Sequence, residues 1–480
     1  MTYIYLIIKI INIVLIAPAS VYVSLRSFNF KNKYNIIYSY VFSFCFISWL
    51  YIFFLRITPH HSSFYYISVT TLPFVFVLLL KIRLIKLFLK EFNGFKIIIK
   101  KLNKFSFFVF LFMIVFNILW FLQNPLIGND PLQYFYLSSL IDNMKDVSFY
   151  PSTTAIDERG FIAPWSHPLG YPGLLAWGRL GLDQELGLFF SKICSFFMTL
   201  LIALIFVFVL YKETNRINFW ASLLLITTPI CLSGSFECHI DSSRMLLFFT
   251  SFLIVYEYIK NVSEKNFSQK DVAYFLILGV SFGFSWFYHS SGILTYVICM
   301  GMLAIFFLLT QIKEMSFYRM LKKYIPLIFL TTLTMLLIVC MDLYSSFKVH
   351  GKLLTDLENI KIINLMSDEY KIYFDLSRDM KSLYDKISFG LGKIFTEINL
   401  FGIVYFLFIL SIFLSIKKIK MNKNITLYDL SIWFVLFFYF FVIVFTIFGI
   451  NTFVFNPRYL LQIHPVVCLS VAFQMKRIWK

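Results

Sequence analysis

The chain has 480 residues, of which 59% are hydrophobic, 20% aromatic and only 14% charged. Soluble domains are closer to half apolar and a quarter charged, so this composition excludes an ordinary soluble protein and indicates an integral membrane protein. The 43 Lys and Arg residues outnumber the 25 Asp and Glu residues and give a net charge of +18. In a membrane protein such an excess is first a topology signal rather than a sign of nucleic-acid binding.

Apolar stretches of spanning length recur along the whole chain. Windows of about 20 apolar residues predict about thirteen transmembrane helices, within a range of twelve to fourteen. In chain order they are 3–25, 36–57, 64–80, 105–122, 186–211, 217–234, 244–259, 272–288, 292–310, 324–344, 395–416, 427–449 and 459–475. Two longer and more polar segments, 123–185 and 345–394, interrupt the series. The sequence therefore predicts an all-α polytopic membrane protein with two long loops.

Basic residues alternate between the two sides of the predicted helices. Most Lys and Arg residues lie in connections 26–33, 81–104, 212–216, 260–270, 313–323 and 417–423 and at 476–480. The intervening short connections hold at most one each, at Arg56, Arg244 and Arg458. Because Lys and Arg collect in short cytoplasmic loops, the N-terminus and both long loops are expected outside and the C-terminus inside. The bias towards Lys, Asn, Ile and Phe is typical of an A+T-rich genome, and the absence of retention signals fits a bacterial inner membrane.

Polar clusters gather on the predicted outer side. They contain Asp130 and Tyr134 after the fourth span, Asp157, Glu158, His167 and Tyr171 later in that loop, Asp241 and Arg244, His289, and Arg458, Tyr459 and His464. Charged groups at membrane depth are costly and mark functional sites by default. Several such groups on one face predict a polar site in which a lipid head group is handled.

Each cluster also has a structural interpretation. Asp130 followed by Pro131 is typical of a helix N-terminus. The side chains of Arg244 and Arg458 could extend to phospholipid head groups, and the Pro and Gly residues of 167–173 could simply shape a loop. A metal site at 238–241 has suitable residue types, but neighbouring residues are poorly placed to aim at one ion.

The order of these clusters resembles the GT-C superfamily. These multi-span glycosyltransferases use polyprenyl-phosphate sugars and include the protein O-mannosyltransferases and the lipid A aminoarabinose transferases. The resemblance covers residues from about 105 to the C-terminus and rests on Asp130, Tyr134, His167, Pro168, Tyr171, Pro172, Asp241, Gly279, Gly283, Gly292, Arg458 to Leu461 and Pro465. The chain departs from the family pattern in three places: its loop follows the fourth span rather than the first, Asn129 precedes Asp130 where the family often has Asp-Glu, and Gln462 and His464 precede Pro465.

The resemblance implies transfer of a hexose or pentose from a polyprenyl-phosphate donor to an acceptor on the extracytoplasmic face, with inversion. Asp130 would be the catalytic base, with Asp241 as a second catalytic carboxylate. The donor phosphate would be bound by Arg458, His464 and Arg244. Substrate-binding roles fall to Tyr134, His167, Tyr171, Asp157, Glu158, His289 and Tyr459. The residues require no cofactor, and whether a divalent metal ion takes part stays open.

Four regions follow from this interpretation: 1–104 with three helices and a basic cytoplasmic loop, 105–344 with a GT-C-like catalytic core, the second outer loop 345–394, and the C-terminal helices of 395–480. The expected partners are the lipid-linked sugar, a lipid, glycan or protein acceptor, and membrane lipids, without nucleic acid. An O-antigen-type polymerase or ligase with a diphosphate-linked donor is one alternative. A lipid or glycan transporter, which would be expected to show internal repeats with broken helices, and a non-catalytic scaffold are the others.

Overall fold

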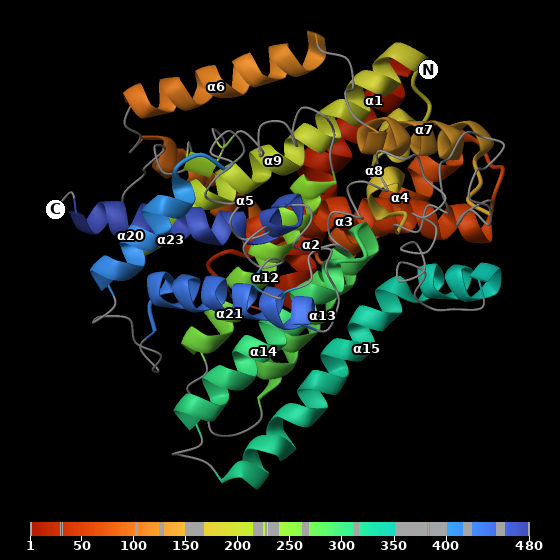
Figure 1. The fold of residues 1–480 in the computed structure, drawn as a ribbon. Coiled ribbons are helices and arrows are strands. Elements are labelled where there is room, and N and C mark those ends of the chain that lie inside the picture. The colour runs from red at the N-terminus through yellow and green to blue at the C-terminus, as the bar shows by residue number, and fades with distance from the viewer. Residues whose placement is uncertain are drawn as a thin grey trace.

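The computed structural model is helical throughout the elements that it describes (Figure 1). It describes residues 2–28, 30, 32–100, 104–123, 129–148, 168–214, 224–225, 228, 240–261, 268–311, 316–350, 382, 384, 401–415, 425–447 and 457–478. The helices are α1 (Thr2–Ile11), η1 (Asn12–Ile16), α2 (Ala17–Ser27), α3 (Asn35–Ile57), α4 (Ser63–Leu80), α5 (Ile82–Lys100), α6 (Lys104–Gln123), α7 (Asn129–Met144), α8 (Gly170–Arg179), α9 (Gln184–Thr214), α12 (Asp241–Asn261), α13 (Gln269–Tyr288), α14 (Gly292–Gln311), α15 (Phe317–His350), α20 (Val404–Ser415), α21 (Leu427–Ile447), η3 (Pro457–Ile463) and α23 (His464–Ile478).

Eight helical segments in these ranges are long and apolar enough to cross a membrane. They are Thr2–Ser27, Asn35–Ile57, Ser63–Leu80, Gln184–Thr214, Gln269–Tyr288, Gly292–Thr310, Phe317–Lys348 and Leu427–Val444. Each coincides with one of the predicted spans. The structure therefore supports a polytopic, all-helical membrane protein.

The other five predicted spans do not form helices of that length and apolarity within the described residues. The expected count of about thirteen transmembrane helices is therefore not shown. Three contain shorter apolar helices, at Phe107–Phe116, Val404–Leu414 and Leu460–Gln474. The predicted span 217–234 falls almost entirely outside the described residues. The span 244–259 is part of α12, a helix with charged residues near both ends.

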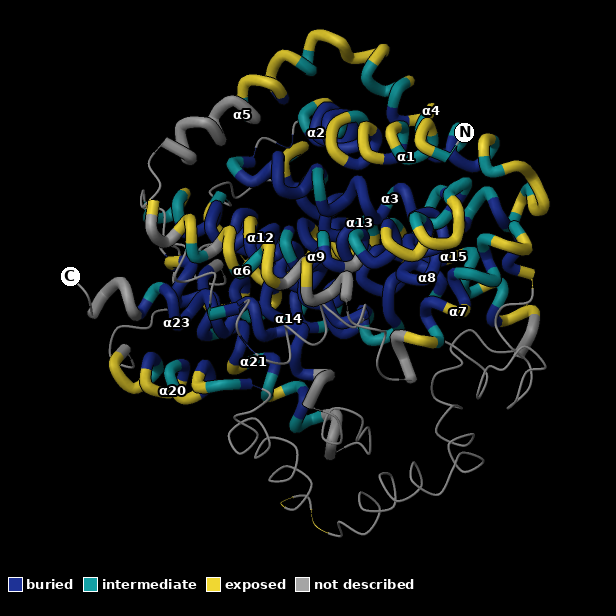
Figure 2. Tube along the Cα trace, turned by 90° about the horizontal axis from the view of Figure 1, so that it is seen from above, coloured by how far each residue is buried: buried dark blue, intermediate teal, exposed yellow. Residues whose placement is uncertain are grey.

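Helix α12 lies in the interior of the helical bundle. Every residue from Asp241 to Ile259 is buried (Figure 2), and α9, α13, α14 and η3 all pack against it. A helix that is buried on all sides belongs to the core of a large protein rather than to its lipid-facing surface. This position explains how α12 can carry charged residues that a lipid-exposed span would not tolerate.

Helices α13 and α15 approach closely because two glycines face the contact. A Cβ added at Gly279 would lie 2.7 Å from the Thr331 carbonyl oxygen and 2.7 Å from the Thr334 Cβ. One added at Gly283 would lie 2.7 Å from a terminal carbon of Ile338. Small residues four positions apart let membrane helices pack backbone to backbone. Two of the glycines in the family resemblance therefore have a packing role.

Part of the predicted loop 123–185 is helical and buried. Helix α8 is buried from Gly170 to Gly178, and three N-terminal spans hold it. Ser48 of α3 donates to the Gly170 carbonyl, and Lys9 of α1 donates to the Gly178 carbonyl at 2.9 Å. The Trp177 indole donates to Thr70 of α4 at 3.1 Å. The first three spans therefore fix the position of α8.

Ion pairs between segments fit the alternating course of the chain. Lys33 pairs with Glu213, Lys323 with Asp271 and Arg26 with Glu91, all at ends predicted to be cytoplasmic. Arg56 and Asp342 pair at ends predicted to lie outside. Charges on opposite sides of a membrane could not make such contacts. The pairs fit the predicted alternation, whereas the side that faces the cytoplasm stays a prediction.

Candidate functional site

The first turn of α12 carries a buried ion pair. Arg244 Nη1 lies 2.7 Å from Asp241 Oδ1, and the two side chains are 3% and 2% exposed. Their spacing of three residues places them on one face of the helix, and an acidic residue in the first turn interacts favourably with the helix dipole. The neighbouring Ser242 hydroxyl lies 2.9 Å from the Thr199 hydroxyl of α9. A fixed guanidinium and carboxylate are thus held at the predicted outer end.

The segment that carries Arg458 packs against α12. Arg458 and Tyr459 lie in the 3-10 helix η3, and η3 contacts α12. Their side chains are outside the described part of the structure. The sequence predicts that Arg458 shares a site with the Asp241–Arg244 pair, and the backbone contact between η3 and α12 is compatible with that prediction.

His464 is the first residue of α23 and is fully buried. Its Nε2 lies 3.1 Å from the Thr228 hydroxyl and 3.4 Å from the Cys468 sulfur. Its ring lies 5.8 Å from the Tyr405 ring and 6.5 Å from the Phe401 ring. Nδ1 has no hydrogen-bond partner among the described residues. These neighbours suit a packed histidine with one ring nitrogen left for a ligand, and its predicted phosphate contact stays a prediction.

The connection between α13 and α14 places a histidine at the same predicted side. His289 is 4% exposed. Its Nδ1 accepts a hydrogen bond from the Ser291 amide at 3.0 Å and lies 2.8 Å from the Ser291 hydroxyl. A ring nitrogen that accepts from a backbone N–H carries no proton, so the neutral ring holds its hydrogen on Nε2. The Ser291 contacts therefore fix the orientation of the His289 ring.

The start of α8 packs against the end of α13. The contact on α13 is at Phe287, two residues before His289. A Cβ at Gly170 would lie 2.5 Å from the Phe287 carbonyl oxygen, so the two backbones are in direct contact. The next residue, Tyr171, packs edge to face on Tyr134 of α7 with ring centroids 5.3 Å apart, and both rings are buried. Three of the predicted substrate-binding residues therefore belong to elements that pack in sequence, α7 on α8 and α8 on α13.

The side chain of the predicted catalytic base and several other predicted site residues lie outside the described part of the structure. Asp130 is the second residue of α7, but its side chain is outside the described part. Asp157, Glu158 and His167 lie wholly outside it. Their predicted roles stay predictions.

The chain leaves α7 through a tightly bonded turn. Lys145 and His60 both have positive φ, 52° and 63°, and the His60 amide donates to the Lys145 carbonyl at 2.8 Å. Burial raises the pKa of Asp146, but hydrogen bonds from the side chain and amide of Ser148 and from the amide of Val147 outweigh it, so the pKa is below its usual value. Such backbone conformations persist only where surrounding contacts impose them. The chain is therefore held in place at residues 145–148.

No group of three or more His, Cys, Asp or Glu residues suited to a metal ion occurs within the described residues. The candidate cluster at 238–241 lies there only in part, because Cys238 and His239 are outside the described ranges.

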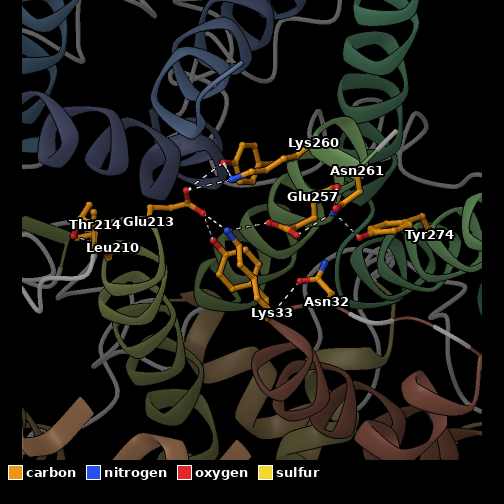
Figure 3. A network of polar contacts seen from close by, with 11 residues as sticks. Asn32, Lys33, Leu210, Glu213, Thr214, Glu257, Lys260, Asn261 and Tyr274 are labelled. Carbon is orange, nitrogen blue, oxygen red and sulfur yellow. Dashed lines mark hydrogen bonds and ion pairs between the residues drawn. The ribbon is translucent and has the colours of Figure 1, made fainter. Parts of the chain in front are cut away.

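A second charged network lies at the other end of α12 (Figure 3). Lys33 pairs with Glu213 of α9 and lies 3.3 Å from Glu257 of α12. Lys260 lies 3.8 Å from the second Glu213 oxygen. Tyr34 donates to Glu213 at 2.9 Å. Two carboxylates and two ammonium groups thus balance one another across three segments.

Phenol and amide groups complete this network. Tyr256 donates to Glu213 at 3.3 Å, and the Asn261 amide donates to the Tyr274 hydroxyl at 3.2 Å. Burial, with the nearby charges of Glu213 and Glu257, raises the pKa of Tyr34 well above its usual value. The sequence alone does not reveal this network, because acids and lysines at span ends look like ordinary solvated loop charges. The available signal was the presence of acids within the ends of apolar segments.

Comparison of the chain with protein-family models, curated proteins and solved structures found no match.

Proposed function

We propose that the protein is a membrane glycosyltransferase that transfers a sugar from a polyprenyl-phosphate donor to an acceptor on the extracytoplasmic face. The observation that carries the proposal is the packing of η3, which contains Arg458, against α12, whose first turn contains the buried Asp241–Arg244 pair. In this proposal Arg458 extends from η3 towards that helix end, so that two arginines and a carboxylate meet there. Such an arrangement would suit the handling of an anionic lipid head group.

The chemistry requires little beyond these residues. A sugar attached to a lipid phosphate has a leaving group that is already a weakly basic anion, so its departure needs charge stabilisation more than protonation. Arginine binds phosphate with paired, charge-assisted hydrogen bonds, and Arg458 and Arg244 would supply them. Asp241, ion-paired to Arg244, would hold that guanidinium in one orientation.

The acceptor hydroxyl needs a base that takes its proton and side chains that orient it towards the donor sugar. Asp130 would accept its proton as it attacks the anomeric carbon, with inversion of configuration, a role that contributes about 10²- to 10⁴-fold in rate. His289, whose ring is oriented by Ser291, would contribute to binding of the substrate. Tyr134 and Tyr171 would shape the approach from the α7–α8 side.

The test is transfer from radiolabelled polyprenyl-phosphate sugars by the purified protein in liposomes. Arg458→Ala and Asp130→Asn should each lower the rate at least about 100-fold, because each removes a transition-state interaction. Arg319→Ala is the matched control, since Arg319 is an exposed arginine at the start of α15, and it should keep full activity. Undiminished transfer in both site variants would refute the assignment.

The donor series separates this proposal from its alternative. If only diphosphate-linked oligosaccharides are used and monophosphate sugars are inert, the protein is a polymerase or ligase instead.

A further inference from the structure

Helix α5 extends from the bundle at the ends of α2 and α4. It begins one residue after α4, at Ile82, and one face is fastened to α2. The buried Phe88 ring packs edge to face on Tyr22 at 5.5 Å, and Glu91 pairs with Arg26. These contacts set the rotation of α5 about its own axis and therefore determine which side chains face away from the protein.

The opposite face of α5 is basic. Arg83, Lys86 and Lys90 are all exposed. At 100° per residue they fall within an arc of about 60°, on the side away from Phe88. No ion pair of these three side chains occurs within the described residues. The cations form a stripe rather than scattered surface charges.

Large apolar side chains border the basic stripe. Ile82 is 63% exposed and Leu89 is 47% exposed, and both lie on one edge of the stripe. If the helix lay in water, its apolar side chains would not gain the free energy of burial. If it lay inside the hydrocarbon core of the membrane, burying its cations would cost free energy. A helix that combines both features is most stable in the plane of the membrane interface, with its apolar edge in the acyl boundary and its cations among the head groups.

We propose that this face of α5, formed by Ile82, Arg83, Lys86, Leu89 and Lys90, binds anionic phospholipid head groups of the leaflet at the inner ends of α2 and α4. The charge of the stripe and its apolar border select such lipids over zwitterionic ones, because each cation near an anionic surface contributes to binding. The surface is independent of the proposed transfer reaction.

The experiment compares amide hydrogen exchange of the full chain in nanodiscs of phosphatidylcholine alone and in nanodiscs that also contain phosphatidylglycerol. Amides of α5 should exchange at least about tenfold more slowly with the anionic lipid. The triple variant Arg83→Gln, Lys86→Gln, Lys90→Gln should lose this difference. Unchanged protection of α9 in the variant shows that the bundle has folded.

A matched variant separates a specific surface from general charge. Lys270→Gln, Arg319→Gln, Lys322→Gln removes three exposed cations from the predicted same side, on α13 and α15. It should keep the lipid-dependent protection of α5. Equal exchange in both lipids, or equal loss in the two triple variants, would overturn the proposal.

Discussion

The two ends of α12 use buried charge in different ways. At the end near Glu257, the ion pairs join separate segments, the 28–34 connection, α9 and α12, and phenols add further hydrogen bonds. At the other end, the Asp241–Arg244 pair joins two residues of the same turn. A pair that bridges segments holds the fold together, whereas a pair within one turn orients its own members. This difference predicts that the first end contributes mainly to stability, and it is compatible with the chemistry proposed for the second.

The largest expected effect is on transfer at the Asp241–Arg244 end. Asp241→Asn removes the ion-pair partner of a buried guanidinium and should cost about 3–5 kcal/mol of unfolding free energy. Transfer from a polyprenyl-phosphate sugar should fall at least about 100-fold, because Arg244, the proposed ligand of the donor phosphate, loses its orientation.

The double variant Asp241→Asn, Arg244→Gln decides between the two roles. It leaves no uncompensated charge from the pair, so much of the lost stability should return in thermal unfolding. Transfer should stay low, because the cation is gone. Recovery of both stability and transfer would mean that the pair is only structural.

At the Glu257 end the expected effect is on stability alone. Glu213→Gln removes the carboxylate that Lys33, Lys260 and two tyrosines share. The side chains of Lys33 and Lys260 are 28% and 49% exposed. The unfolding free energy should therefore fall by about 2 kcal/mol, which is less than the cost of breaking a fully buried pair. Thermal unfolding in one detergent measures it.

The control for this variant is Glu185→Gln, which makes the same change at an exposed site in the first turn of α9. It should leave the unfolding temperature almost unchanged. If Glu213→Gln lowers transfer per folded molecule as strongly as the Asp241 variants do, the division between the two ends fails.

The middle of the bundle, where no charges are involved, gives a reference for pure packing. Gly279→Ala forces a Cβ against the Thr331 backbone of α15 and should destabilise by about 1–3 kcal/mol. Gly301→Ala is a milder control, because its Cβ would meet the ring edge of Phe437, 2.8 Å away, which can shift. Both should keep full transfer per folded molecule. Equal costs would argue against a rigid α13–α15 contact.

The sequence predicts the membrane helices well because the bilayer imposes the rule: a spanning segment must satisfy its own backbone in an apolar solvent. The eight long apolar helices follow from that rule alone. It says nothing about α8, which is buried through contacts with Ser48, Lys9 and Thr70, all distant in sequence. Nor does it predict that the acids Glu213 and Glu257 meet Lys33.

The sequence likewise predicts the local features of the candidate site but not its tertiary contacts. Asp241 and Arg244 could be chosen as unusual charges at a span end, and their pairing follows from a spacing of three residues. That α12 is buried on every side depends on how the helices assemble. The contact between η3 and α12 likewise joins residues about two hundred positions apart and has no local signal.

The smallest expected effect lies midway along α12, between its two charged ends. The Ser251 hydroxyl of α12 lies 2.8 Å from the Ser281 hydroxyl of α13, and both are buried. Hydroxyl pairs between membrane helices contribute only about 0.6 kcal/mol on average, because each hydroxyl also finds a carbonyl on its own helix in the separated state. Ser251 already donates to the Leu247 carbonyl at 2.9 Å. A double-mutant cycle of Ser251→Ala and Ser281→Ala, followed by thermal unfolding, should therefore give a coupling of that size and no change in transfer. A coupling as large as that of the Glu213 network would mean that α12 is held along its whole length, and the contrast between its ends would then lose its meaning.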